Sequence, residues 1–233
     1  SSNVPVQINS DTNWKTIEAG GHILAIKQDG SLSAWGQNNL GQLGFTANSV
    51  IYRAPVRIGT DNDWLKISAS YGNSIAIKSN GSLWSWGENS MGKTGRTPGL
   101  ITPQPTQVGS EFNWSDVYIG SHAAIGIKSN KSVWVWGSNY FGSLGLGIDP
   151  FKKTPAQVVS NIGWKEICTN DLTTFGIKLD GTLWAWGANN SGIYNSNKIN
   201  SNIPVQIGTG TNWKTITAVW GSVAAIKTDG TLW

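Results

Sequence analysis

Tryptophan recurs along this chain at nearly constant spacing. The residues Trp14, Trp64, Trp114, Trp164 and Trp213 lie 50, 50, 50 and 49 residues apart, and a proline keeps the same spacing at positions 5, 55, 105, 155 and 204. A period of this length is typical of repeat folds, in which each unit buries its apolar face against the next unit. The sequence therefore predicts one domain over residues 1–233, built from five copies of a single unit.

Each copy is expected to contain four short strands. In the second copy these cover residues 64–68, 74–78, 82–86 and 106–108. The dipeptide Asn80-Gly81 lies between the second and third strands and favours a two-residue hairpin turn, which needs positive φ. Lys131 takes the place of the turn glycine in the third copy, where its Cβ opposes that conformation.

The second strand of each copy is apolar along its whole length, as in Ile23-Leu24-Ala25-Ile26. A sheet with one wet face would alternate apolar and polar residues, so both faces are expected to be covered. Four-stranded antiparallel units stacked face to face are the blades of a β-propeller. The predicted fold is therefore an all-β propeller, with repeats at about 14–57, 64–107, 114–157 and 164–206.

The two ends of the chain carry the parts of a further blade. Residues 4–9 resemble the fourth strand of a copy, and residues 213–233 contain the first three strands. Pairing the ends would complete a fifth blade and remove two exposed sheet edges. The alternative is that the chain is a fragment of a seven-bladed ring.

Several phrases recur in the same order in the copies. In the first copy they are residues 14–17, 19–27, 29–32 and 35–44, the last reading Trp-Gly-Gln-Asn-Asn-Leu-Gly-Gln-Leu-Gly. This succession resembles the regulator of chromosome condensation repeat over nearly the whole chain. The resemblance implies a propeller, most often seven-bladed, that presents loops to a partner. Members of that family include an exchange factor, a photoreceptor, an enzyme inhibitor and ubiquitin-ligase domains, so the fold alone does not determine the function.

The composition speaks against several classes of function. The 17 Lys and Arg residues are scattered, whereas nucleic-acid binders concentrate positive charge on one face. Cys168, His22 and His122 are too few for an ordinary zinc site, and catalysis would need a base beside a nucleophile or a second carboxylate. We expect no enzyme, cofactor, metal or nucleic-acid partner. The chain has no apolar run of the ~20 residues that a membrane span needs.

Loops that differ between copies are the expected place for partner binding, because positions of the scaffold repeat. The connections after the first and third strands should emerge on one face of the ring, and exposed aromatic and Arg side chains dominate binding hot spots. Tyr71 and Trp220, in short loops, are the main candidates. The longer loops are expected to cover residues 45–54, 96–104, 146–154 and 194–203. The further candidates for partner binding lie in these loops and their flanks: Tyr52, Arg53, Arg96, Tyr140, Phe141, Phe151, Lys152, Lys153 and Tyr194.

The leading hypothesis is a non-enzymatic module that binds another protein through this variable face, alone or within a larger complex. Low charge and many Asn, Ser, Thr and Gly residues favour a cell-surface or virion component over a cytoplasmic protein. A lectin-like propeller that binds glycans is one alternative, although it would need the same loop residues in every blade. A regulator or inhibitor of a partner enzyme or GTPase is the other.

Overall fold

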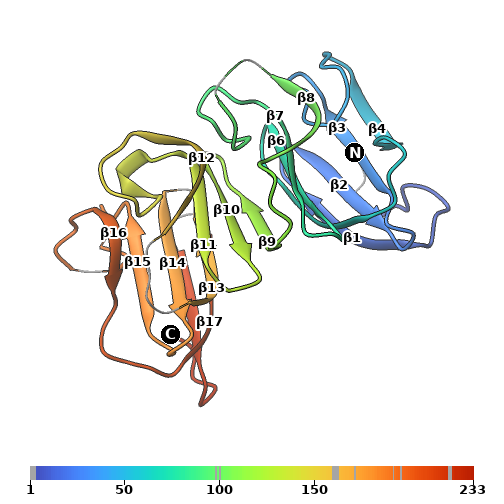
Figure 1. The fold of residues 1–233 in the computed structure, drawn as a ribbon. Coiled ribbons are helices and arrows are strands. Elements are labelled where there is room, and N and C mark those ends of the chain that lie inside the picture. The colour runs from blue at the N-terminus through green and yellow to red at the C-terminus, as the bar shows by residue number, and fades with distance from the viewer. Residues whose placement is uncertain are drawn as a thin grey trace.

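The computed structural model describes residues 4–97, 99, 101–158, 163–170, 172–190, 192–194, 196–219 and 222–233. They form antiparallel sheets of consecutive strands, which we call blades 1 to 5 (Figure 1). Blade 1 contains β1 (Trp14–Ala19), β2 (His22–Lys27), β3 (Leu32–Gln37) and β4 (Ile51–Arg57). Blade 2 contains β5 (Trp64–Ala69), β6 (Asn73–Lys78), β7 (Leu83–Gly87) and β8 (Thr102–Gln107).

Blade 3 contains β9 (Trp114–Ile119), β10 (Ala123–Lys128), β11 (Val133–Ser138) and β12 (Phe151–Gln157). Blade 4 contains β13 (Trp164–Thr169), β14 (Thr173–Lys178), β15 (Leu183–Gly187) and β16 (Ser201–Gln206). Blade 5 has two strands, β17 (Trp213–Val219) and β18 (Ser222–Lys227), with a bridge from Ile226 to Leu232. The described residues otherwise contain one 3-10 turn, Tyr140–Gly142, and no helix among them is long and apolar enough to cross a membrane. The predicted all-β class with four-stranded antiparallel blades is therefore confirmed.

The apolar cores lie between neighbouring blades, in the spaces that we call seams. In the seam of blades 1 and 2, Leu24, Ile26 and Leu32 of blade 1 pack with Trp64, Ile67 and Trp86 of blade 2. The same arrangement recurs in the next three seams. A single blade is too thin to bury both of its faces, so each one depends on its neighbours for a dry interior.

In three of the four seams a tryptophan contributes both packing and one hydrogen bond to the preceding blade. The indole Nε1 of Trp86 donates to the carbonyl oxygen of Gln42 in the preceding blade at 2.9 Å. Trp136 and Trp186 donate in the same way to Lys93 and Ser143, also at 2.9 Å. Because a buried indole N–H needs a partner, this bond lets the largest side chain of the blade enter the core without a desolvation penalty.

The lysine that ends each second strand contacts tryptophan: Lys27 lies over one ring, and its counterparts in blades 2 to 5 each lie between two rings. Lys78 Nζ is 4.8 Å from the centroid of Trp64 and 4.7 Å from that of Trp84. The same ammonium pairs with Asp61 at 2.6 Å and Asp63 at 3.1 Å. Burial alone would lower the pKa of Lys78, but the hydrogen bonds to the two carboxylates outweigh burial and raise it. These lysines therefore stabilise the blade instead of forming a free cationic surface.

The fourth strands differ from the prediction because they begin earlier in the chain. In blade 2 the fourth strand covers Thr102–Gln107 instead of residues 106–108. A register shift between Ser85 and Gly87 bends the β7–β8 ladder, and Gly87 takes a φ of 105° there. Prolines at 103 and 105 argue against a strand by sequence, but an outer strand tolerates them because one of its edges is unpaired.

The predicted pairing of the two chain ends is not formed. Blade 5 is a two-stranded sheet, and residues 4–9 belong to no described strand. Figure 1 shows the N and C ends at opposite ends of a row of blades. Ile8 lines a cavity of about 280 Å³ together with Trp14, Trp35 and Pro55 of blade 1. The angle between blades is set by the packing in each seam, so complementary end segments are not sufficient to bring the ends together.

The hairpin turn of blade 3 has the strain that the sequence predicts. Lys131 has a φ of 66°, whereas the equivalent positions hold Gly30, Gly81, Gly181 and Gly230 with φ between 79° and 85°. A Cβ on Gly30 would lie 2.1 Å from the carbonyl oxygen of Asn62. In blade 3, Gly163 lies beside Lys131, where it provides room for the Cβ.

Candidate protein-binding face

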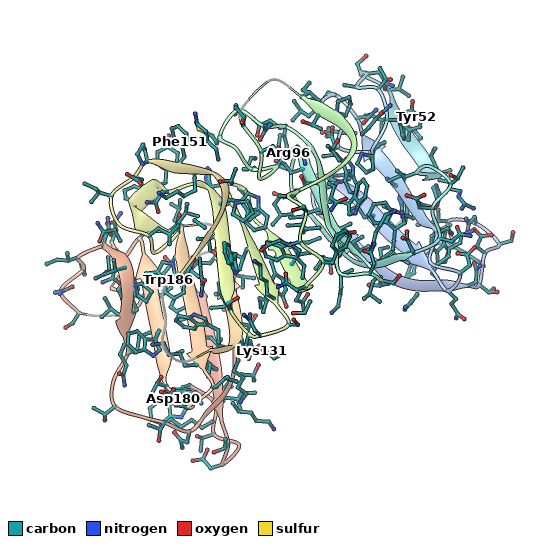
Figure 2. The ribbon with its side chains drawn as sticks, in the orientation of Figure 1. Tyr52, Arg96, Lys131, Phe151, Asp180 and Trp186 are labelled. Carbon is teal, nitrogen blue, oxygen red and sulfur yellow. The ribbon has the colours of Figure 1, made fainter. Side chains whose placement is uncertain are left out.

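The loops after the first and third strands of each blade emerge on one face, which we call the loop face. Figure 2 shows this arrangement in blades 2 to 4: Arg96 and Phe151 lie toward one end of the sheets, whereas Lys131 and Asp180 lie at the hairpin turns on the other end. The loop face contains the segments that differ most between copies.

A repeated asparagine holds the base of each long loop. The Asn38 side chain donates from Nδ2 to the carbonyl oxygen of Thr46 at 2.9 Å and accepts at Oδ1 from the amide of Leu43 at 3.1 Å. Asn139 makes the corresponding bonds to Gly147 and Leu144, each at 2.9 Å. A side-chain amide that satisfies backbone groups from both ends of a loop limits its movement. The variable loop tips are therefore displayed from a rigid base.

The long loops also cross the seams. Gly41, Gly92 and Gly142 have φ between 70° and 81°, and a Cβ on any of them would collide with the next blade. For Gly92 the nearest atom would be the Cα of Lys153 on β12, at 2.9 Å. Glycine allows this close approach because it has no side chain. Neighbouring blades thus contribute to one continuous loop face.

Exposed aromatic side chains lie in the loops of this face at blades 2 and 3. Tyr71, Tyr140 and Phe141 are exposed, and His122 is half-buried beside them. The ring centroids of His122 and Tyr140 are 5.7 Å apart in an edge-to-face arrangement, and those of Tyr140 and Phe141 are 6.5 Å apart. We call these four residues the aromatic patch. Two separate loops supply its part on blade 3, and they meet because β10 pairs with β11.

A largely buried ion pair connects the blade 2 loop that carries Tyr71 with the blade 3 loop that carries His122. Lys93 Nζ lies 3.1 Å from Glu88 Oε2 and donates to the carbonyl oxygen of Ser121, also at 3.1 Å. Glu88 in turn donates from its backbone amide to Gly72, next to Tyr71. Burial would raise the pKa of Glu88, but hydrogen bonds from Ser90 and the ammonium of Lys93 lower it overall. The ion pair and its hydrogen bonds therefore hold the two loops in place relative to each other.

Phe141 adopts a backbone conformation that the equivalent residues avoid. Its φ and ψ are 55° and 18°, whereas Leu40 and Met91 at the same place in blades 1 and 2 have no positive φ. A left-handed conformation costs a bulky residue about 1 to 2 kcal/mol. Residues held in such conformations cluster at active sites, ligand clamps and switch regions.

Three candidates from the sequence are held by the scaffold. Tyr194 is buried and donates through its hydroxyl to the carbonyl oxygen of Gly187 at 2.8 Å. The Arg96 guanidinium donates to Ser85 and Thr106, and burial lowers its pKa. Tyr52 packs edge-to-face on Phe45 at 5.1 Å. The long loops fold back on their blades and occupy these side chains internally.

The remaining candidates lie outside the aromatic patch. Arg53, Phe151, Lys152 and Lys153 belong to the outer strands β4 and β12 instead of to loops, because the fourth strands begin early. Lys152 pairs with Asp149 at 2.5 Å, and Lys153 lies 5.7 Å from the ring centroid of Phe151. Trp220 lies outside the described residues.

Within the described ranges no three His, Cys, Asp or Glu side chains are grouped as metal ligands. Burial, together with the charge of Glu166, raises the pKa of the Cys168 thiol to about 12. A thiol with this pKa is protonated at neutral pH and is therefore a poor nucleophile. Cys168 is half-buried on β13, where it lines a cavity.

Sequence comparison identifies the repeat. Family models described as the regulator of chromosome condensation (RCC1) repeat match residues 29–77 and 64–93. The probable E3 ubiquitin-protein ligase HERC6 of Homo sapiens is 34% identical over 88 residues, which are 36% of this chain and 9% of that protein. The X-linked retinitis pigmentosa GTPase regulator homolog of Caenorhabditis elegans is 38% identical over 77 residues, or 32% of this chain and 5% of that protein. The matched segments thus cover less than a tenth of these relatives.

Structural comparison extends the similarity to nearly the whole chain. Yeast RCC1 (Prp20), solved with Kap60, superposes with a TM-score of 0.82 at 17% identity, over 96% of this chain and 56% of that one. At this identity the match concerns the fold. Residues 29–93 therefore match regulator of chromosome condensation repeats, and the chain has an RCC1-like β-propeller fold.

Proposed function

We propose that this chain is a non-enzymatic protein-binding module whose partner docks on the aromatic patch of blades 2 and 3. The observation that carries the proposal is the patch itself. Tyr71, Tyr140 and Phe141 are exposed, and they lie in loops that differ between the copies. The largely buried ion pair of Lys93 and Glu88 connects these loops. Rigid aromatic side chains lose little entropy on binding and dominate interface hot spots. The positive φ of Phe141, which the equivalent residues of blades 1 and 2 lack, is a second way in which this loop differs between copies.

The wider context of this module is also a proposal. The structurally similar yeast RCC1 (Prp20) was solved bound to another protein, Kap60, which supports a binding role. A second candidate is regulation of a GTPase, and the name of the Caenorhabditis elegans relative supports it. A place on a cell surface or in a virion rests on the composition alone, with 13% charged residues. Identification of the bound partner would decide among these contexts.

The test is a binding measurement with a matched control. The chain is used to capture its partner by cross-linking, and the Kd of the purified partner is then measured for wild type, Tyr140→Ala/Phe141→Ala and Phe112→Ala. Phe112 is also an exposed aromatic residue but lies next to the turn at Gly81, on the opposite face. We expect the double variant to weaken binding at least roughly tenfold, since hot-spot residues contribute about 2 kcal/mol or more. Phe112→Ala should leave the Kd unchanged.

Unchanged affinity in the double variant, with native thermal stability, would exclude the aromatic patch as the docking surface. Equal weakening by Phe112→Ala would point to a nonspecific hydrophobic contact.

A further inference from the structure

The first strands of four blades surround a cavity whose lining extends to Gly120 in the β9–β10 loop. It has a volume of about 280 Å³ and lies where β1, β5, β9 and β13 face one another. Ile119, Ile125 and Ile167 form an apolar wall, and Glu18, Tyr118 and Cys168 supply polar groups. This volume is close to the lower end of the range of small-molecule sites, roughly 300 to 1,000 Å³.

One position in this cavity differs in every copy. Glu18, Ser68, Tyr118, Cys168 and Thr217 are equivalent, since each pairs with the same position of the second strand. The residue before it is aliphatic in every copy, and in blades 2 to 5 that side chain is buried in a seam, as in Ile67 and Val117. Packing between blades therefore does not determine which residue faces the cavity.

The charges around the cavity are mainly negative. Asp116 is paired with Lys66 at 3.4 Å, and Glu166 accepts a hydrogen bond from Thr215 at 2.9 Å. Glu18 makes no ion pair or side-chain hydrogen bond with the described residues. Burial raises the pKa of the Tyr118 hydroxyl to about 12, and the charges of Asp116, Glu166 and Glu18 add to this effect. A cation entering the cavity would meet a carboxylate without a partner among the described residues and the phenol of Tyr118.

We propose that this cavity binds a small organic cation, a primary amine on an apolar body. The ammonium group would lie between the Glu18 carboxylate and the Tyr118 ring, where ionic and cation–π attraction act together. The apolar body would lie against Ile119, Ile125 and Ile167, which exclude water from it. The neutral thiol of Cys168 adds no competing charge. None of the residues that line this cavity belongs to the aromatic patch, so this proposal does not rest on the proposed function.

The probe is n-hexylamine, titrated into isotopically labelled protein while backbone amide shifts are recorded. We expect saturable shifts centred on Ser68, Tyr118 and Cys168. The carboxylate analogue hexanoate should produce none, because the negative charges around the cavity repel it.

The decisive variant is Glu18→Gln, with Glu111→Gln as its control. Both carboxylates are exposed at the surface, but Glu111 pairs with Lys128 on the turn side, away from the cavity. We expect Glu18→Gln to weaken hexylamine binding at least tenfold and Glu111→Gln to leave it unchanged. The proposal would be overturned by the absence of saturable shifts, by shifts centred elsewhere, or by equal binding in Glu18→Gln that still melts like wild type.

Discussion

The open row of blades makes a direct prediction about two isoleucines at the same place in the repeat. Ile67 fills the seam between blades 1 and 2 and is 7% exposed, whereas Ile17 is on the outer face of blade 1 and is 58% exposed. Replacing either by alanine removes the same three carbon atoms. The two substitutions therefore differ in what surrounds the side chain and in little else.

The expected cost follows from burial. Each buried methylene contributes about 0.8 kcal/mol, so Ile67→Ala loses roughly 2 to 3 kcal/mol of transfer free energy. The cavity left in the seam raises the total to about 3 to 4 kcal/mol. Ile17→Ala should cost about 1 kcal/mol or less, because most of its side chain is already in water. In a domain of this size 1 kcal/mol corresponds to about 2 to 4 °C, so Ile67→Ala should lower the Tm by roughly 6 to 16 °C.

The assay is thermal and urea unfolding of both variants, followed by tryptophan fluorescence. Ile216→Ala is the control, because Ile216 is buried in the seam of blades 4 and 5 and should behave like Ile67. Equal losses for Ile17→Ala and Ile67→Ala would show that the outer face of blade 1 is covered in solution, which would contradict the open arrangement. Small losses for both Ile67→Ala and Ile216→Ala would contradict the packing of the seams.

Two further predictions concern single residues. His22 is buried against the Ser74 hydroxyl at 2.6 Å, and burial lowers its pKa from 6.5 to about 4. The folded state therefore binds fewer protons than the unfolded state, so the free energy of unfolding should fall by up to roughly 3 kcal/mol between pH 6.5 and pH 4. His22→Asn, which copies Asn73 of blade 2, should remove this term in urea titrations at pH 7 and pH 4; a pH dependence that persists would assign it to other groups. Lys131→Gly should raise the free energy of unfolding by about 1 kcal/mol, because glycine relieves the positive φ, and a lower Tm would show that the lysine side chain matters more than the strain.

Residues that repeat between blades form the scaffold, and residues that vary between blades are the candidates for function. The asparagine clamps, the seam tryptophans and the lysines between rings occur in several blades and hold the structure together. The aromatic patch and the cavity position differ from blade to blade. Comparison between copies within one chain thus separates structural residues from candidates for function.

Several side chains could be assigned a role only from their contacts. Tyr194 and Tyr71 are both tyrosines in variable loops, yet one is buried on a backbone carbonyl and the other is exposed. Composition and spacing do not distinguish them, because the path of each loop depends on the neighbouring blade. Arg96, labelled in Figure 2, is a similar case: it lies in a variable loop, but its guanidinium donates hydrogen bonds to Ser85 and Thr106 of its own blade.

The sequence by itself determined the all-β class, the four-stranded blade, the repeat and the strained turn at Lys131, because these follow from local periodicity and turn chemistry. Only the tertiary structure decided that the chain ends stay apart, that the fourth strands begin early, and that Glu18, Tyr118 and Cys168 share one cavity. The physical reason is that these features depend on how one blade is rotated against the next. That rotation results from the shapes of many side chains in the seams, which no local pattern in the sequence describes.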